Sequence, residues 1–361
     1  MPPTHHTLLF RPSPTPHPIP LPPHISRHCI PTPLGILELL SAQPPPSSIF
    51  PSPRKKAILF QHGGFGHATI WIPFLTYFSQ HGHPCYALSL RGHGSSWTPS
   101  FFSLVWRYGK MSMAHDLQAA VDFVMDLECE ARGGEMRDED LVLVGHSAGG
   151  GLVQLFLDRG MGTVGGLVIM AGFPNFGGWG VYWNWVKLDP WFAVRFFFRD
   201  LGHPRSPLSE TGLVNKAFFS RGYPVDRVRE FEVLMPEYES LVWPLGMMLS
   251  FVDVAKVLKG IVGWKDEKQQ RVLVIAGEKD TLMGVELMRR MAADYRQRFI
   301  TLAKSFWRFH GVEEGASDLK AGSDDQCGIS FEVIKGSGHH IQNDLYWEEC
   351  AERILVFVHQ L

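Results

Sequence analysis

The sequence has few cysteines, almost no net charge and no long apolar run, and each shortage excludes a class of protein. The 5 cysteines among 361 residues form no Cys-x-x-Cys pair, and an odd number is a poor basis for a disulfide framework. The 34 Lys and Arg residues against 36 Asp and Glu leave a formal charge of -2, which supplies no basic surface for nucleic acid. We therefore expect a cytoplasmic protein that binds no nucleic acid.

Apolar segments are too short or too interrupted for membrane targeting. The N-terminal run Leu8 to Phe10 cannot form the core of a secretory signal. The apolar stretch from 241 to 255 is broken by Pro244, Gly246 and Asp253, and it falls short of the roughly 20 residues that cross a bilayer. The sequence therefore predicts a soluble protein with no transmembrane segment.

Proline is abundant only where regular structure is not expected. Residues 1–33 are so rich in proline that we predict a flexible leader, because each proline removes a backbone donor and restricts its neighbour. The compact domain is expected to begin with a short strand near 35–41. A second group of prolines, between 44 and 53, predicts an irregular stretch before the next strand.

From residue 57 onward, short apolar runs alternate with segments of helical periodicity. The runs are rich in Val and Ile and do not alternate with polar residues, which is typical of strands covered on both faces. The expected strands are 57–60, 85–90, 141–144, 167–171, 272–276 and 329–334. The expected helices are 71–81, 113–128, 148–159, 285–298 and 345–360. This order predicts an α/β fold with a parallel sheet.

Two insertions interrupt the alternation. Residues 173–264 are dense in aromatic side chains and predict a helical cap, either as an ordinary helical core or as a lid whose inner face lines an apolar pocket. Residues 310–327 are polar without periodicity and predict a disordered loop. The core is then expected to comprise 34–172 and 265–361.

The sharpest local signal is Gly145-His146-Ser147-Ala148-Gly149, between an expected strand and an expected helix. A nucleophile on so tight a turn adopts a strained backbone, so small residues are needed two positions before and after it. The sequence therefore predicts Ser147 as a nucleophile held at the carboxyl end of the sheet.

A serine nucleophile needs a base and a carboxylate that orients the base. Asp280 follows the expected strand 272–276, with Glu278 as the alternative carboxylate. His339 follows the last expected strand and is preferred over its neighbour His340, because Gly338 allows a tight approach. We expect the triad Ser147, His339 and Asp280.

Hydrolysis also needs donors directed at the developing oxyanion. One is expected to be the N–H of Ala148, at the start of the helix after the nucleophile. The other is expected from the glycine-rich loop after strand 57–60, from Gly64 first and Phe65 second.

Together these landmarks resemble the α/β-hydrolase superfamily over roughly residues 34 to 361. The shared landmarks, in order, are His62-Gly63-Gly64, Arg91-Gly92-His93-Gly94-Ser95, the Ser147 pentapeptide, Gly277-Glu278-Lys279-Asp280 and Gly338-His339. The resemblance implies an eight-stranded, mostly parallel sheet with helices on both faces, and a helical cap inserted after the sixth strand. It also implies no metal and no organic cofactor, and a structural rather than catalytic role for Arg91 and His93.

The Arg91 loop is similar to that of lysophospholipase-like, monoacylglycerol-lipase-like, esterase and thioesterase members. We therefore expect a serine hydrolase that cleaves an ester or thioester of an apolar acyl substrate. A carbon–carbon bond hydrolase and a small-ligand receptor with a hydrolase-like fold remain alternatives. Dehalogenases and epoxide hydrolases need a carboxylate where Ser147 stands. The aromatic cap also predicts transient contact with a membrane surface, and the oligomeric state leaves no trace in the sequence.

Overall fold

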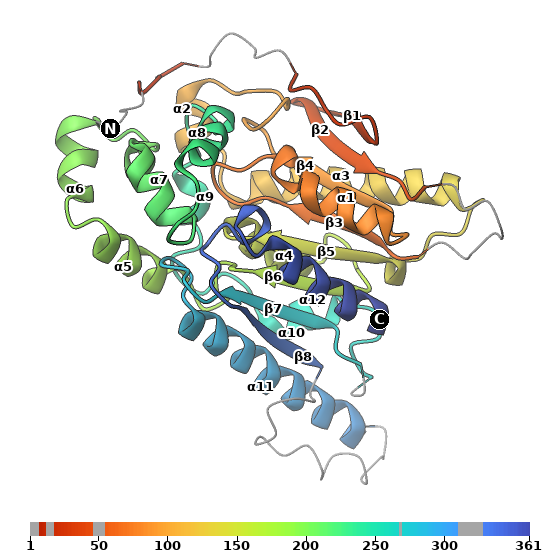
Figure 1. The fold of residues 1–361 in the computed structure, drawn as a ribbon. Helices are drawn as coiled ribbons and strands as arrows, with labels where there is room; N and C mark the ends of the chain where they lie inside the picture. Colours follow the sequence, from red (N-terminus) through yellow and green to blue (C-terminus); the bar gives the residue numbers. More distant parts are fainter. Residues whose placement is uncertain (1–6, 12–17, 46–54, 267–268, 310–327) are drawn as a thin grey trace.

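The computed structural model describes residues 7–11, 18–45, 55–266, 269–309 and 328–361 (Figure 1). Eight strands form one sheet in the order β1-β2-β4-β3-β5-β6-β7-β8. Strand β2 runs antiparallel to β1 and β4, and all other neighbours are parallel. The strands are β1 (Ile25–Thr32), β2 (Gly35–Ala42), β3 (Ala57–Gln61), β4 (Cys85–Ser89), β5 (Leu141–His146), β6 (Gly166–Met170), β7 (Val272–Gly277) and β8 (Ile329–Ile334).

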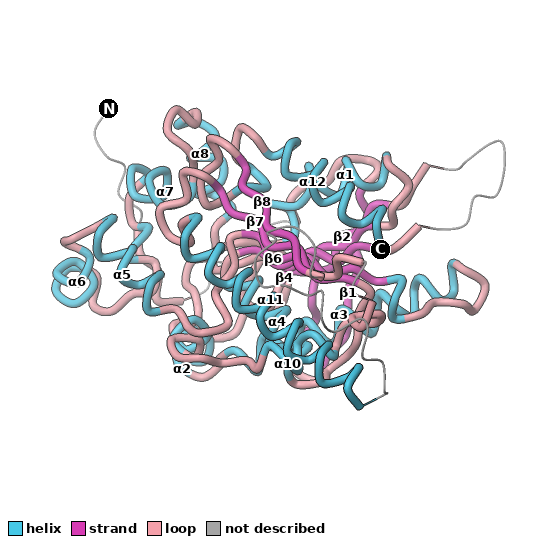
Figure 2. The backbone as a smooth tube through the Cα atoms, turned by 90° about the horizontal axis from the view of Figure 1, so that it is seen from below, coloured by secondary structure: helices cyan, strands magenta, loops and turns pink. Residues whose placement is uncertain are grey.

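Helices cover both faces of the sheet, as the apolar strands require. Every residue of β3, β4, β5, β6 and β7 is buried. Figure 2, along the sheet edge, shows α1 (Ile72–Gln80) and α12 (Trp347–Gln360) on one side. The other side carries α3 (Lys110–Ala131), α4 (Ala148–Asp158), α10 (Val254–Lys259) and α11 (Val285–Phe309). The predicted α/β fold with a mostly parallel sheet is confirmed.

The insertion follows the sixth strand, as expected. Between β6 and β7 the chain forms α5 (Trp179–Leu188), α6 (Phe192–Val194), α7 (Thr211–Phe218), α8 (Val225–Leu234) and α9 (Val242–Leu245), with a π-helical turn at Arg195–Arg199. These elements gather beyond one end of the sheet (Figure 1). Helix α10 instead packs against α4 and α11 of the core. The cap therefore ends before α10, whereas the aromatic content of the sequence predicts an end at residue 264.

The N-terminal boundary also differs from the prediction. Residues 25–32, assigned to the flexible leader, form β1, which pairs along its whole length with β2. An edge strand tolerates Pro31 because only one of its sides carries the ladder. The predicted disordered loop at 310–327 lies outside the described residues.

Glu38 of β2 links three parts of this antiparallel edge. Its carboxylate accepts hydrogen bonds from Arg27 Nε at 2.7 Å, from Ser89 Oγ at 2.8 Å and from the Ser95 amide at 2.9 Å. The side chain is buried, and these donors hold the pKa of Glu38 below its usual value even though burial acts to raise it. One carboxylate thus joins β1, β4 and the loop that follows β4.

We expect Glu38→Ala to lower the free energy of unfolding by about 3 kcal/mol, because it takes the acceptor from the half-buried Arg27 Nε and from the Ser89 and Ser95 donors. Arg27→Ala is the matched control and should cost less, since the two remaining donors still satisfy the carboxylate. Urea unfolding of the three proteins measures both values. Equal losses in the two variants would contradict the role given to Glu38.

Candidate active site

Ser147 occupies the turn between β5 and α4 with φ 55° and ψ -126°. This left-handed backbone is strained for a residue with a Cβ. The turn is crowded: a Cβ on Gly145 would lie 2.6 Å from the Gly149 carbonyl oxygen, and one on Gly149 would lie 2.2 Å from the His62 carbonyl oxygen. The two glycines are therefore required by space, as the sequence pattern predicts.

The structure brings the three expected triad residues together. Ser147 Oγ lies 3.0 Å from His339 Nε2, and His339 Nδ1 lies 2.9 Å from Asp280 Oδ2. Asp280 follows β7, where its other oxygen accepts the amides of Leu282 at 2.7 Å and Met283 at 2.9 Å. Two amides therefore hold the Asp280 carboxylate in place while its second oxygen faces the imidazole. The other ring nitrogen is within reach of the Ser147 hydroxyl proton.

Neither alternative residue is placed to replace its neighbour. Glu278 is part-exposed and accepts the Gly336 amide at 2.9 Å instead of facing His339. The ring of His340 lies among aromatic side chains of the cap, with its centroid 4.8 Å from that of Phe231. The preference for Asp280 and His339 therefore agrees with the geometry.

The glycine loop after β3 packs directly on this turn. A Cβ on Gly63 would lie 2.6 Å from Ser147 Cβ and 3.2 Å from the Ala148 nitrogen. Among the described residues, the amides of Gly64 and Ala148 have no recorded hydrogen-bond acceptor. The Phe65 amide instead donates to Glu239 Oε2 at 2.8 Å. Gly64 and Ala148 therefore remain the predicted oxyanion donors, whereas the Phe65 amide is already bonded.

Comparison with known proteins identifies the family of the chain. Residues 58–353 match the model of the Alpha/beta hydrolase family. The chain belongs to this family. No curated protein matches the sequence.

Solved structures similar to this α/β hydrolase share its fold at low sequence identity. A thermophilic esterase from Thermogutta terrifontis is 17% identical with a TM-score of 0.57, over 92% of this chain and 98% of that one. An esterase from Exiguobacterium antarcticum is 15% identical with a TM-score of 0.55, over 90% and 96%. A haloalkane dehalogenase, DatA from Agrobacterium tumefaciens C58, is 12% identical with a TM-score of 0.55, over 93% and 97%.

Contacts with the cap hold the loop that carries His339 in this hydrolase. The His340 amide donates to the Phe218 carbonyl oxygen at 2.7 Å, and the Phe218 ring stacks on His339 with centroids 5.9 Å apart. Asp344 accepts both the Gly338 amide at 2.7 Å and the Ser220 hydroxyl at 2.6 Å. The position of His339 therefore depends on the cap.

The Arg91 loop has the structural role implied by the family resemblance. Arg91 forms a buried two-pronged ion pair with Asp116, with Nε to Oδ2 at 2.8 Å and a second nitrogen to Oδ1 at 2.6 Å. Its guanidinium carbon lies 4.7 Å from the centroid of the Tyr108 ring. Sequence reasoning missed Asp116 and Asp344, because no local pattern marks either residue.

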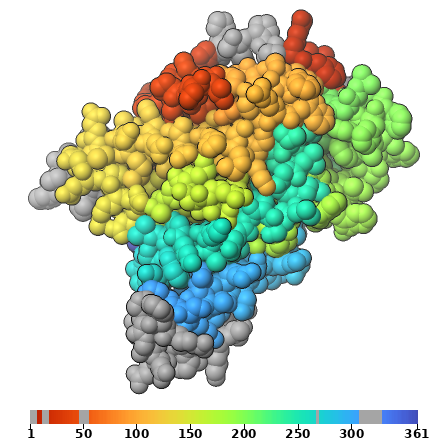
Figure 3. All heavy atoms as spheres, turned by 180° about the vertical axis from the view of Figure 1, so that it is seen from behind, coloured from red at the N-terminus to blue at the C-terminus, as the bar shows by residue number. Residues whose placement is uncertain are grey.

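Several cap aromatics point away from the site. Trp179, Trp183 and Trp191 are more than 60% exposed, and Phe198 is 83% exposed. Trp179 and Trp183 lie in α5, Trp191 directly precedes α6, and Phe198 lies in the π-helical turn; this region is the light green lobe at the edge of Figure 3. These rings therefore lie on the outer surface of the cap and not on the inner face that the sequence predicts for a lid. Their exposure is compatible with the predicted contact with a membrane surface, which stays a prediction.

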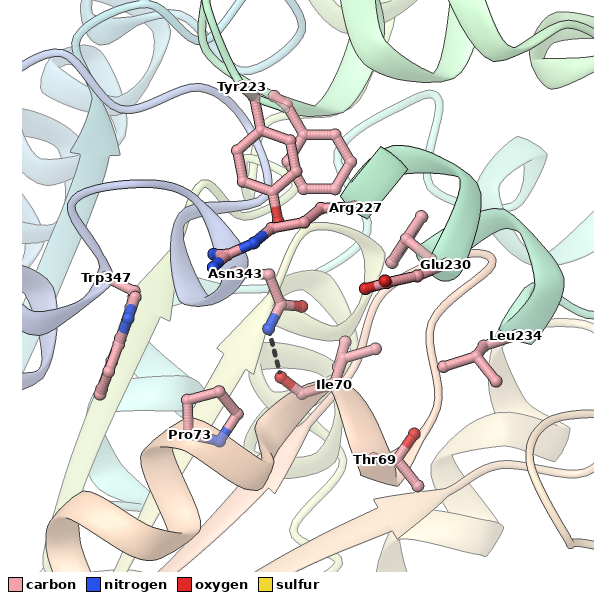
Figure 4. Close-up of a pocket in the computed structure, with 11 residues that line it drawn as sticks. Thr69, Ile70, Pro73, Tyr223, Arg227, Glu230, Leu234, Asn343 and Trp347 are labelled. Atoms are coloured by element: carbon pink, nitrogen blue, oxygen red, sulfur yellow. Dashed lines mark hydrogen bonds between the residues drawn. The ribbon is translucent and has the colours of Figure 1, made fainter. Parts of the chain in front are cut away.

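A pocket of about 440 Å³ lies between the cap and the core (Figure 4). The cap contributes Tyr223, Arg227 and Phe231, and the core contributes Ile70 and Trp347 from the opposite wall. Phe219, another wall residue, is the direct neighbour of Phe218, which covers His339. None of the triad residues lines this pocket, and most of its lining is apolar or aromatic.

The described part of the chain shows neither a metal-ligand cluster nor a membrane-spanning helix. No group of three or more His, Cys, Asp or Glu residues there is placed to hold a metal ion. None of its helices is both long and apolar enough to cross a membrane.

Three buried histidines near Ser147 make no ion pair with a described residue. Burial lowers the pKa of His62, His146 and His340 well below the usual 6.5. Their contacts agree with neutral rings: His62 Nδ1 donates to the Gly63 carbonyl oxygen while Nε2 accepts the Leu90 amide. His146 Nε2 donates to the His339 carbonyl oxygen at 2.9 Å, and its Nδ1 has no partner.

These histidines should make the hydrolase acid-sensitive. Below pH 6.5 the histidines of the unfolded chain take up protons that the buried rings of the folded protein cannot. The free energy of unfolding therefore falls by up to about 1.4 kcal/mol per ring for each unit by which the pH is lowered. His340→Phe removes one such group from an aromatic surrounding. Its stability should fall less steeply than that of the wild type between pH 7 and pH 5, as measured by urea unfolding. If the free energy of unfolding depends on pH equally in the variant and the wild type, the role given to His340 is contradicted.

Proposed function

We propose that the protein is a serine hydrolase that cleaves a carboxylic ester or thioester of an apolar acyl substrate. The observation that carries this proposal is the continuous chain of contacts from Ser147 Oγ to His339 at 3.0 Å and from His339 to Asp280 at 2.9 Å. A carboxylate at the position of Ser147 would be needed for dehalogenase chemistry, so the dehalogenase neighbour is not a guide to the reaction.

The proposed reaction proceeds through an acyl-enzyme. Ser147 Oγ attacks the carbonyl carbon while His339 takes the hydroxyl proton, and Asp280 stabilises the resulting imidazolium. The amides of Gly64 and Ala148 donate to the oxyanion. His339 then protonates the leaving alcohol or thiol. In the second half it takes a proton from water, whose oxygen attacks the acyl carbon and releases Ser147.

The apolar substrate class is supported by the surroundings of the triad. Phe218 covers His339, and the nearby pocket places Phe219, Phe231 and Ile70 along its walls. Apolar walls with a few polar groups are typical of sites that hold small organic ligands. Arg227 and Glu230 also line this pocket, at its polar side.

A fluorophosphonate probe should label the wild type, and labelling should disappear in Ser147→Ala. Turnover of p-nitrophenyl esters and acyl thioesters of increasing chain length should fall by about 10⁴-fold or more in the same variant, because the nucleophile is lost. Folded wild type that resists the probe would contradict an activated serine. Labelling without turnover of any ester or thioester would instead favour the carbon–carbon hydrolase or the ligand receptor.

The two candidate carboxylates can be separated by a matched pair of variants. Asp280→Asn should lower kcat by about 10⁴-fold, because the amide favours the wrong tautomer of His339. Glu278→Gln should leave kcat within about twofold, since Glu278 faces the Gly336 amide and solvent. Steady-state kinetics with the ester that the wild type hydrolyses fastest measures both. The opposite order would assign the orienting role to Glu278.

A further inference from the structure

Glu239 brings a buried carboxylate from the insertion to the loop that carries the expected oxyanion donor. It lies between α8 and α9 and is 4% exposed. Its Oε2 accepts the Phe65 amide and His93 Nε2, each at 2.8 Å, and its Oε1 accepts the Ser240 amide at 2.7 Å. A Cβ on Gly64 would lie only 3.6 Å from Oε2. The triad makes no use of this carboxylate.

The segment around Glu239 is fastened to the core on both sides. The Tyr238 hydroxyl donates to the Pro99 carbonyl oxygen at 2.8 Å, and the Ser240 hydroxyl donates to the Tyr108 carbonyl oxygen at 2.7 Å. Because both neighbours of Glu239 are held in this way, the carboxylate is a fixed point against which the glycine loop can be placed.

His93 balances the charge of Glu239. Its Nδ1 faces the Arg91 carbonyl oxygen at 2.9 Å and its Nε2 faces the carboxylate, so both ring nitrogens meet acceptors and each needs a proton. Burial acts to lower the pKa of His93, but the Glu239 carboxylate outweighs it and the pKa is raised. The result is a buried ion pair rather than an isolated anion beside Gly64.

The loop needs such an anchor because Phe65 has a left-handed backbone, with φ 60°. This conformation is unfavourable for a side chain with a Cβ and persists only where the surroundings enforce it. The hydrogen bond from the Phe65 amide to Glu239 supplies that restraint at the residue next to Gly64. A small error in the direction of the Gly64 N–H would weaken its bond to an oxyanion.

We propose that Glu239 is a positioning residue of the reaction: by holding the Phe65 amide it fixes the left-handed turn that directs the Gly64 N–H at the oxyanion. The proposal rests on the proposed serine hydrolase. It also gives the insertion a direct part in the oxyanion site, through a group that does not touch the substrate.

The test compares Glu239→Gln and Glu239→Ala with the wild type and with Glu237→Gln, a nearby carboxylate of the same segment. Glu239→Ala should lower kcat for a small activated ester by about 100-fold with KM changed less than threefold, because the loss is confined to the transition state. Glu239→Gln keeps an oxygen for the Phe65 amide and should lose less. Glu237→Gln should match the wild type. Thermal unfolding identifies the temperature at which all variants are folded, and Glu239→Gln carries the test if the alanine variant does not fold.

A second readout does not depend on activity. Hydrogen exchange measured by mass spectrometry should be faster at peptides that cover residues 62–66 in Glu239→Ala, faster by a smaller amount in Glu239→Gln, and unchanged in Glu237→Gln. Unchanged exchange there would overturn the inference. Equal rates of fluorophosphonate labelling in the wild type and Glu239→Ala, or a loss carried by KM alone, would overturn it as well. A wild type that resists the probe would overturn the proposed function, and hydrogen exchange would still decide whether Glu239 holds the loop.

Discussion

The left-handed turn at Ser147 is the constraint on which the site depends. A strained residue of this kind costs of order 1–3 kcal/mol and persists only where its surroundings hold it. Here the Ser147 amide donates to the Met170 carbonyl oxygen at 3.0 Å, and the Ser147 carbonyl oxygen accepts the Phe173 amide at 3.0 Å. Strand β6 and the start of the insertion therefore hold the turn, and the glycines beside it allow the loop after β3 to approach.

Parallel strands explain why residues far apart in the sequence meet at that turn. The carboxyl ends of β3, β5, β7 and β8 lie at one edge of the sheet, so the loops that leave them converge. Ser147, Asp280 and His339 leave three of these strands. The insertion then covers the same edge and bonds to what it covers, through Phe218 to the histidine loop and through Glu239 to the glycine loop. The cap is therefore part of the site rather than only its lid.

The sequence predicts those features that a few consecutive residues mark, and it misses contacts between distant positions. The Ser147 turn and the buried strands have signatures within a few residues, and the order of the elements places Asp280 and His339 at the same edge. Strand β1 was hidden because prolines near it suggested irregular chain. The sequence also does not show which way the cap aromatics point. A segment rich in aromatic residues can turn their rings toward the core or toward solvent. Glu239 and Phe65 are separated by 174 positions, and no spacing rule links them.

The charge states of the buried histidines follow from the groups that each ring nitrogen meets. His62 and His146 each have at least one nitrogen that meets no acceptor, so they stay neutral, and burial agrees by lowering their pKa. His93 meets acceptors on both nitrogens and is charged, but Glu239 neutralises it. Because the nearby rings contribute no net charge, the proposed mechanism relies on oriented dipoles to stabilise the oxyanion: two amides and the start of α4. Such dipoles are effective in a site from which water is excluded, because they need no rearrangement when the charge appears. In this mechanism the cap, which binds the Phe65 amide next to Gly64 through Glu239, acts on the oxyanion through geometry rather than through charge.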